Sequence, residues 1–231
     1  MAPISQATGT SELRTMDVYL IPGLGADHRL FDRLELPGHR LVKLDWPEMP
    51  VGSTLADYAL ALALQVDVTR PHALVGVSMG GMVAQELAAI TDPRHVVIIS
   101  SWKGPHEMPP HLKLLRGTNP ERVLNRTFLK RSLPLVRWQM GVERPDEIAL
   151  LDRFLELHPL EQLRIQIGAC LEWKGLQRPV VSLTHIHGDK DHLMPLSNIK
   201  GAVVVKGGGH FMVYSQAPEV GRNVMEVLGR A

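Results

Sequence analysis

Cysteine is nearly absent from this sequence, because Cys170 is the only one in 231 residues. A single cysteine excludes an internal disulfide and fits a reducing compartment. Cys170 lies in an apolar run of helical composition, which predicts a small buried residue rather than a reactive thiol.

The sequence also has no excess charge of either sign. It contains 25 Lys and Arg residues against 24 Asp and Glu residues, and its pI is about 8.0. A balanced chain has no global field that would attract nucleic acid or an anionic membrane surface. This balance favours a small molecule as the partner.

Long apolar runs are missing as well, since none approaches the roughly 20 residues of a membrane span. Residues 1–15 have neither an apolar core nor early basic residues, so we expect a disordered leader rather than a signal peptide. There is no internal repeat and no low-complexity segment. These absences predict a soluble cytoplasmic protein with one domain over residues 16–231.

The first hundred residues alternate between short apolar strands and helical segments. We expect strands at 18–21, 41–44, 72–77 and 95–99, and helices at 27–34, 54–68 and 79–90. Short connections between such elements favour a doubly wound, mostly parallel sheet of the α/β class. Continuous apolar strands are typical of a sheet that is buried on both faces.

This alternation stops after Ser101. Residues 102–175 contain no convincing strand but several helical segments, at about 119–131, 132–140, 145–157 and 159–173, separated by prolines. We interpret residues 102–160 as a helical cap over the strand ends, and the last helix as the return to the sheet. Strands at 180–186 and 202–205 and a helix at 216–228 then complete the domain.

A Gly-x-Ser-x-Gly pattern, Gly76 to Gly80, lies between the third strand and the following helix. A serine on such a sharp turn exposes its hydroxyl at the end of the strand, above the N-terminus of the helix. Free N–H groups and the helix dipole favour a developing anion there. The pattern alone is weak evidence, because many chains contain it by chance.

Two further loops at strand ends carry the groups that would activate this serine. One contains Asp189 and Asp191, and the other contains His210. A serine hydroxyl is a poor nucleophile unless an imidazole takes its proton, and a carboxylate must orient that imidazole. The chain supplies these groups in the order Ser, Asp, His.

Four motifs together resemble the α/β-hydrolase family from about residue 16 to 229. They are Ile21-Pro22-Gly23-Leu24-Gly25, Gly76-Val77-Ser78-Met79-Gly80-Gly81, His187-Gly188-Asp189-Lys190-Asp191-His192-Leu193-Met194-Pro195 and Gly208-Gly209-His210-Phe211-Met212. The resemblance implies that Ser78 is the nucleophile and His210 the general base. The family pattern Gly-x-x-Asp-x-x-x-Pro selects Asp191 as the acid, with Asp189 as the competitor.

The same resemblance implies an oxyanion hole formed by the backbone N–H groups of Leu24 and Met79, and it implies no cofactor. Two positions depart from the frequent family form. Pro22 stands where a His often precedes the glycine, and Val77 stands where a His often precedes the serine. These departures affect loop packing and substrate preference rather than the reaction.

A rival interpretation is a zinc site, because His185, His187, Asp189 and His192 resemble the His-x-His-x-Asp-His signature of zinc hydrolases. Lys190 stands where that signature needs a histidine, and the further downstream ligands are missing. We therefore expect no metal, and we expect His185 and His187 to be structural or to line a pocket.

Three residues are candidates for the substrate pocket: His28, Trp102 and Phe211. His28 has an alternative role in anchoring its loop, and Asp45, at another strand end, is expected to form a turn or to flank the substrate.

The expected activity is that of a serine esterase acting on a small to medium organic molecule. A serine at position 78 argues against dehalogenases and epoxide hydrolases of similar sequence, which have Asp there. The alternatives with the same triad are a carbon–carbon hydrolase, a lactonase, a thioesterase and an acyltransferase. A receptor that only binds its ligand is the alternative from another class. The sequence specifies neither the substrate nor the oligomeric state.

Overall fold

The structure of the protein is a computed structural model that describes residues 15–229. The expected leader, apart from Thr15, lies outside the described residues. The sheet has six strands in the order β2-β1-β3-β4-β5-β6, and every neighbouring pair is parallel. The strands are β1 (Asp17–Ile21), β2 (Arg40–Lys43), β3 (His72–Val77), β4 (His95–Ile99), β5 (Leu183–Gly188) and β6 (Val203–Val205).

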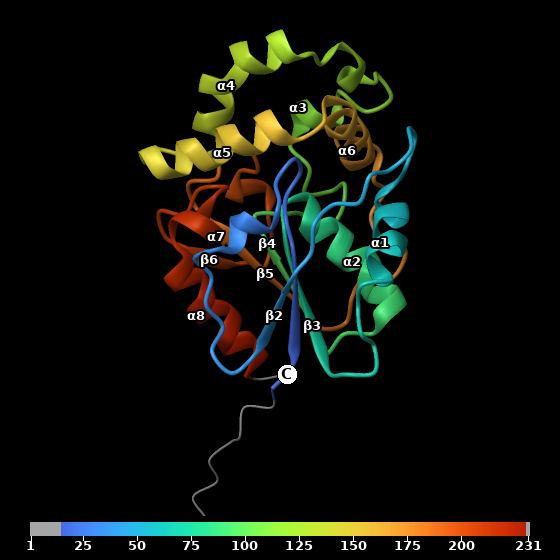
Figure 1. Cartoon of the computed structure of the whole chain (residues 1–231), viewed down its shortest axis with the longest axis vertical. Helices are drawn as coiled ribbons and strands as arrows, with labels where there is room; N and C mark the ends of the chain where they lie inside the picture. The colour runs from blue at the N-terminus through green and yellow to red at the C-terminus, as the bar shows by residue number, and fades with distance from the viewer. Residues whose placement is uncertain (1–14, 230–231) are drawn as a thin grey trace, which may run out of the picture.

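The central strands are buried because both faces of the sheet are covered. In β1, Val18 and Leu20 belong to one hydrophobic cluster, and Tyr19 and Ile21 belong to the other. This alternation follows from the two-residue period of a strand. Helices α1 and α2 cover one face and α8 covers the other (Figure 1). The predicted doubly wound parallel sheet is confirmed.

The helices supply the two outer layers and the cap. In chain order they are η1 (His28–Phe31), α1 (Leu55–Ala63), α2 (Met79–Thr91), α3 (Pro110–Lys113), η2 (Pro120–Val123), α4 (Arg126–Met140), α5 (Pro145–Leu157), α6 (Leu160–Glu172), η3 (Leu196–Asn198), α7 (Met212–Ser215) and α8 (Ala217–Leu228), where η marks a 3-10 helix. None of these helices is both long enough and apolar enough to cross a lipid bilayer.

The insertion between β4 and β5 is helical, as the sequence predicts. Figure 1 shows α4 and α5 lying across the end of the sheet, with α6 leading back toward it. Two backbone contacts tie this cap to the loops below. Phe211 donates its N–H to the carbonyl of Met140, and Gly25 donates its N–H to the side chain of Gln166. The cap therefore rests on the C-terminal ends of the strands.

Two predicted helix boundaries are wrong. Helix α1 ends at Ala63 instead of continuing to residue 68, because Asp67 accepts hydrogen bonds from the N–H and the hydroxyl of Thr69 and forms a turn. The predicted break near Pro134 is also absent. Helix α4 runs through this proline, between Asn125 at its N-cap and Gly141 at its C-cap. Pro134 is exposed, so its ring meets solvent rather than another element.

Three smaller differences concern turns and strand starts. The predicted helix at 27–34 is only the short 3-10 helix η1, which Asp27 caps. The strand predicted from residue 180 begins at Leu183, where pairing with Val96 of β4 begins. Helix α7 immediately follows the loop that carries His210, and no sequence pattern indicated it.

Asp17, the first residue of β1, makes the folded state sensitive to acid. Its buried carboxylate accepts two hydrogen bonds from Arg40, at 2.8 and 2.5 Å, and lies 3.0 Å from Nε of Arg70. The guanidinium of Arg40 lowers the pKa of Asp17 despite the opposing effect of burial. A depressed folded-state pKa stabilises the protein above the unfolded pKa of about 4, and this contribution disappears as the pH falls.

We therefore expect Asp17→Asn to be less stable than the wild type at pH 7. The difference between their free energies of unfolding should narrow as the pH falls below about 4, because the wild-type carboxylate becomes protonated. Urea denaturation across this pH range measures both quantities. A difference that stays constant from neutral to acidic pH would contradict this role of the carboxylate.

Candidate active site

Ser78 lies between β3 and α2 in a backbone conformation that few residues adopt. Its φ is 55° and its ψ is −121°. The surrounding structure holds this strained conformation in place. The Ser78 N–H donates to the carbonyl of Ile99 at 2.9 Å, and its carbonyl accepts from the hydroxyl of Ser101 at 2.7 Å. Strand β4 and its following loop therefore fix the position of the serine.

The glycines around Ser78 are required because backbone approaches them closely. A Cβ at Gly76 would lie 2.1 Å from the carbonyl oxygen of Gly80. A Cβ at Gly80 would lie 2.3 Å from the carbonyl oxygens of both Ile21 and Pro22. Only glycine permits these approaches. The start of α2 is thus pressed against the loop that follows β1, which brings the two predicted oxyanion donors to the same edge of the sheet.

Asp191 and His210 form a hydrogen-bonded pair in the loops that follow β5 and β6. Nδ1 of His210 lies 2.8 Å from Oδ2 of Asp191, and both side chains are buried. The other carboxylate oxygen, Oδ1, accepts the N–H of Met194 at 2.7 Å. An ionised carboxylate only accepts hydrogen bonds, so Nδ1 of His210 carries a proton, and in the neutral form of the imidazole this leaves Nε2 as the acceptor. This is the tautomer that a general base requires.

Several neighbours keep Asp191 ionised. Burial raises the pKa of this carboxyl, but the imidazole of His210, the N–H of Met194 and the imidazole of His187 together lower it below its ordinary value. Asp191 is therefore negatively charged at neutral pH and can stabilise an imidazolium at His210.

The competing carboxylate, Asp189, has a different position. It is exposed, and its Oδ1 accepts the N–H of Gly207 at 2.6 Å. This bond joins the loops after β5 and β6, as does the bond from the N–H of Lys190 to the carbonyl of Gly208, at 2.8 Å. The geometry thus pairs His210 with Asp191 and gives Asp189 a role in loop structure.

Ser78 and the Asp191–His210 pair follow parallel strands of one sheet and therefore lie at the same edge. Among the described residues, the Ser78 hydroxyl has no hydrogen bond to His210. Catalytic hydrogen bonds of this kind are often long before a substrate binds.

The N–H groups of Leu24 and Met79 are the predicted oxyanion donors. Met79 is the first residue of α2, where N–H groups have no acceptor within the helix. Gly23, the residue before Leu24, lies beside the serine, since a Cβ built there would be 3.4 Å from Cβ of Ser78. In the described part of the chain, no loop or side-chain hydrogen bond has the N–H of Leu24 or Met79 as its donor.

The buried side chains of His185 and His187 are joined by a hydrogen bond, and His187 lies next to Asp191. Nε2 of His187 lies 2.7 Å from the carbonyl oxygen of Met194 and 3.6 Å from Oδ2 of Asp191. A carbonyl only accepts, so His187 carries its proton on Nε2, and its Nδ1 accepts from Nε2 of His185 at 3.1 Å. Burial lowers the pKa of both rings, that of His185 to about 3, so both are neutral at pH 7. Their hydrogen bonds connect β5 to the loop that carries Asp191.

The residues that the structure describes include no group of three His, Cys, Asp or Glu side chains placed to hold a metal ion. Cys170 is buried, as predicted, and burial raises the pKa of its thiol to about 12.

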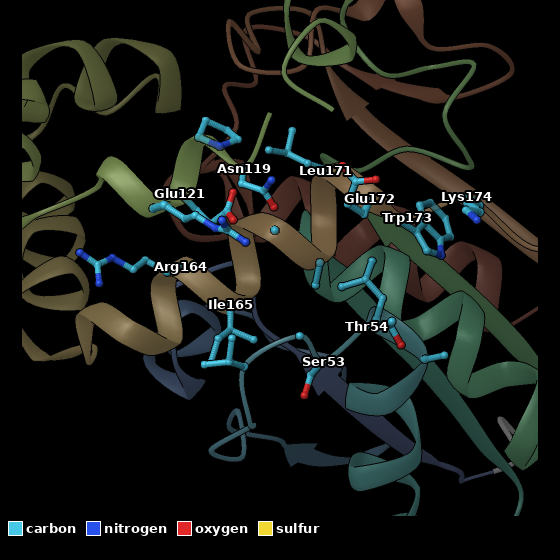
Figure 2. Close-up of a pocket in the computed structure, with 18 of the residues that line it drawn as sticks. Ser53, Thr54, Asn119, Glu121, Arg164, Ile165, Leu171, Glu172, Trp173 and Lys174 are labelled. Atoms are coloured by element: carbon cyan, nitrogen blue, oxygen red, sulfur yellow. The ribbon is translucent and has the colours of Figure 1, made fainter. Parts of the chain in front are cut away.

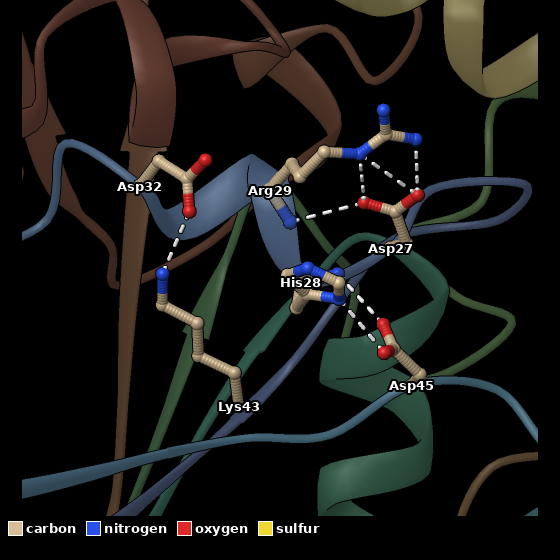
Figure 3. Close-up of polar contacts among 6 residues, drawn as sticks. All are labelled: Asp27, His28, Arg29, Asp32, Lys43 and Asp45. Atoms are coloured by element: carbon tan, nitrogen blue, oxygen red, sulfur yellow. Dashed lines mark hydrogen bonds and ion pairs between the residues drawn. The ribbon is translucent and has the colours of Figure 1, made fainter.

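The three pocket candidates occupy different environments. His28 is exposed, and both its N–H and its Nδ1 lie 2.8 Å from the carboxylate of Asp45, which ties η1 to the loop after β2 (Figure 3). Trp102 is buried in the cluster that contains Met79, and its carbonyl accepts from Gln85. Phe211 is buried next to His210. The geometry of His28 and Asp45 favours the anchoring role for both.

A cavity of about 710 Å³ lies between α1, α6 and η2 (Figure 2). Its lining includes the N-terminal turn of α1, one side of α6 and residues of η2, among them Thr54, Glu121, Ile165 and Trp173. Ser78, Asp191 and His210 do not line it. The predicted triad and this cavity are therefore separate features of the structure.

Sequence reasoning missed several residues that hold the site together. Ser101 binds the carbonyl of Ser78, Gln166 binds the loop after β1, and Trp138 of α4 stacks on His192, with ring centroids 4.5 Å apart. Trp46 also binds the loop after β1. Trp46 and Ser101 had a signal, because each follows a predicted strand at the edge where the site lies.

Comparisons with known proteins show the family of the chain. The sequence matches the alpha/beta hydrolase family over residues 18–222. No curated protein matches the chain.

Solved structures with the same fold include two esterases and a thioesterase. An esterase from Thermogutta terrifontis is 20% identical with a TM-score of 0.74, covering 93% of this chain and 90% of that one. An esterase from Exiguobacterium antarcticum is 15% identical with a TM-score of 0.71, covering 92% and 91%. A type II thioesterase of the yersiniabactin pathway is 19% identical with a TM-score of 0.65, covering 94% of both chains. At these identities the likeness shows the fold alone, whereas the family match spans most of the sequence. The chain belongs to the alpha/beta hydrolase family.

Proposed function

We propose that the protein is a serine hydrolase that cleaves a carboxylic ester of a small to medium organic molecule through an acyl-enzyme on Ser78. The observation that carries this proposal is the serine at positive φ above the N-terminus of α2, at the same edge of the sheet as the buried Asp191–His210 pair. The fold and its esterase and thioesterase neighbours support a hydrolase activity in general.

The reaction follows from the protonation states. Nε2 of His210 takes the proton of the Ser78 hydroxyl while the serine oxygen attacks the ester carbonyl. The N–H groups of Leu24 and Met79 stabilise the resulting oxyanion, each by roughly 3 kcal/mol. His210 then protonates the leaving alcohol. A water molecule, deprotonated by the same histidine, attacks the acyl-enzyme and releases the acid and the free serine.

The proposal needs no cofactor, because the nucleophile, the base and the anion donors all belong to this chain. The same groups serve a thioesterase, a lactonase, a carbon–carbon hydrolase or an acyltransferase. We choose an ester because its hydrolysis needs only water as a second reactant and no activated carrier, and because the solved neighbours include esterases.

A panel of acyl compounds tests this choice. We expect saturable hydrolysis of at least one p-nitrophenyl ester between acetate and decanoate, measured by p-nitrophenolate release. Acyl-coenzyme A thioesters and simple lactones serve as the comparison, and Ser78→Ala is the control. Hydrolysis of thioesters or lactones alone would contradict the choice of an ester, and binding of all compounds without turnover would favour a receptor.

A further inference from the structure

The loop after β1 carries the Leu24 N–H, and two side chains from distant parts of the chain bind the peptides on either side of this residue. Nε1 of Trp46, in the loop after β2, donates to the carbonyl of Gly23 at 2.9 Å. The carbonyl of Gly23 and the N–H of Leu24 belong to the same planar peptide unit and point in opposite directions. By holding the carbonyl, the indole therefore fixes the direction of the N–H.

The Gly23 carbonyl has a second donor, the N–H of Ala26 at 3.1 Å. Two donors on one carbonyl withdraw electron density from the peptide, which makes its N–H a stronger donor, because linked hydrogen bonds polarise one another. The position of Gly23 beside Ser78 places this peptide next to the nucleophile.

The following peptide is held from the cap. Gly25 has φ of 69° and donates its N–H to Oε1 of Gln166 at 2.8 Å. Gln166 lies on α6 and is fully buried. A buried amide cannot exchange this partner for bulk water, so the bond also fixes the loop against the cap.

Trp46 is itself held in place. Its ring packs edge-on against Tyr58 of α1, with centroids 5.4 Å apart. The preceding residue, Asp45, accepts two hydrogen bonds from His28. Figure 3 shows this pair beside the further ion pairs that pin η1. The indole thus comes from a loop that is anchored on both sides.

We propose that Trp46 and Gln166 are positioning residues that fix the Leu24 N–H as an oxyanion donor, with neither side chain touching the substrate. This inference rests on the proposed function, because it needs an oxyanion at Ser78. It predicts that losing either bond impairs the transition state rather than substrate binding.

The test compares Trp46→Phe and Gln166→Met with the wild type. Phenylalanine keeps a ring against Tyr58 but has no N–H, and methionine keeps the length of the side chain but has no amide. We expect each variant to lower kcat for p-nitrophenyl acetate by about 10- to 100-fold, part of what a whole donor contributes, with KM within about threefold. Inhibition by phenylboronic acid, which forms a tetrahedral anion on the serine, should weaken by a similar factor.

Trp173→Phe is the matched control, because Nε1 of Trp173 also donates a hydrogen bond, to Glu86 at 2.6 Å, on the far side of α6. It should retain wild-type kcat. An unchanged kcat in both test variants, a rise in KM alone, or an equal loss in the control would overturn the inference while the proposed function stands. The midpoint of thermal unfolding of each variant shows whether it is folded. If Trp46→Phe does not fold, the kcat of Gln166→Met tests the inference. A wild-type protein that hydrolyses no ester would instead overturn the proposed function.

Discussion

Replacement of Ser78 by alanine is expected to lower kcat for the best p-nitrophenyl ester by about a million-fold, as in other enzymes that lose a catalytic serine. The residual rate would come from the oxyanion donors and from substrate binding. Initial rates over a range of substrate concentrations measure the loss. The fold should persist, because the backbone of Ser78, rather than its hydroxyl, makes the contacts with Ile99 and Ser101.

Two further variants test whether the loss in Ser78→Ala is due to the catalytic hydroxyl. Ser53→Ala removes a hydroxyl that only binds the carbonyl of Pro50, so its activity should equal that of the wild type. The double variant Ser78→Ala/His210→Ala should be no slower than Ser78→Ala alone, because the two groups act as a unit. Additive losses in the double variant would show that His210 does not act through Ser78.

Replacement of Asp191 by asparagine should lower kcat by about 10,000-fold, because an amide can donate to Nδ1 of His210 and so favour the wrong tautomer of the imidazole. The volume of the side chain is unchanged, and the amide oxygen can still accept the N–H of Met194. The pH dependence of kcat, measured together with its magnitude, reports the loss of a functional base.

Asp189→Asn is the matched control, two residues away in the same loop. Its side chain binds the N–H of Gly207, and an amide oxygen can accept the same bond, so we expect less than about a threefold change in kcat. Equal losses in the two variants, or a larger loss in Asp189→Asn, would contradict the assignment of Asp191 as the acid.

The parts of this architecture that depend on pattern could be predicted from the sequence. Continuous apolar strands that alternate with helices through short connections indicated the parallel sheet, and parallel strands place their C-terminal ends at one edge. Each member of the predicted triad, Ser78, Asp191 and His210, follows such a strand. Their order in the chain and their position at one edge of the sheet could therefore be predicted from the sequence. The choice between Asp191 and Asp189 depended on the family pattern, and the structure supplies the hydrogen bond that distinguishes them.

Contacts between distant segments could not be predicted in this way. In the sequence, Gln166 is one polar residue of an amphipathic helical pattern. Nothing in its spacing indicates that its side-chain amide accepts a hydrogen bond from Gly25, 141 residues earlier in the chain. The burial of His187 against Asp191 likewise depends on how the acid loop folds back over β5. Helix ends were uncertain for a related reason. The turn formed by Asp67 follows from local hydrogen bonds that compete with helix propensity, and the continuity of α4 through Pro134 has no signal in the sequence.

The helices between β4 and β5 lie over the ends of the strands, and they also contact the loops that carry the predicted site. These helices contact the loop after β1 at Gln166, the loop after β6 at Met140 and the loop after β5 at Trp138. Helix α4 has no buried residue, and the ion pair of Arg137 with Asp152 also ties it to α5. The loops that carry the predicted site are therefore held by residues that are far apart in the sequence.

The central claim, that Ser78 is a nucleophile activated at the edge of the sheet, is tested most directly by reaction with a fluorophosphonate. The folded protein is treated with the probe, and mass spectrometry locates the modified residue. We predict one adduct per chain on the peptide that contains Ser78, and none in Ser78→Ala or after denaturation. An adduct on another residue, or an unlabelled Ser78 in the folded wild-type protein, would contradict the claim.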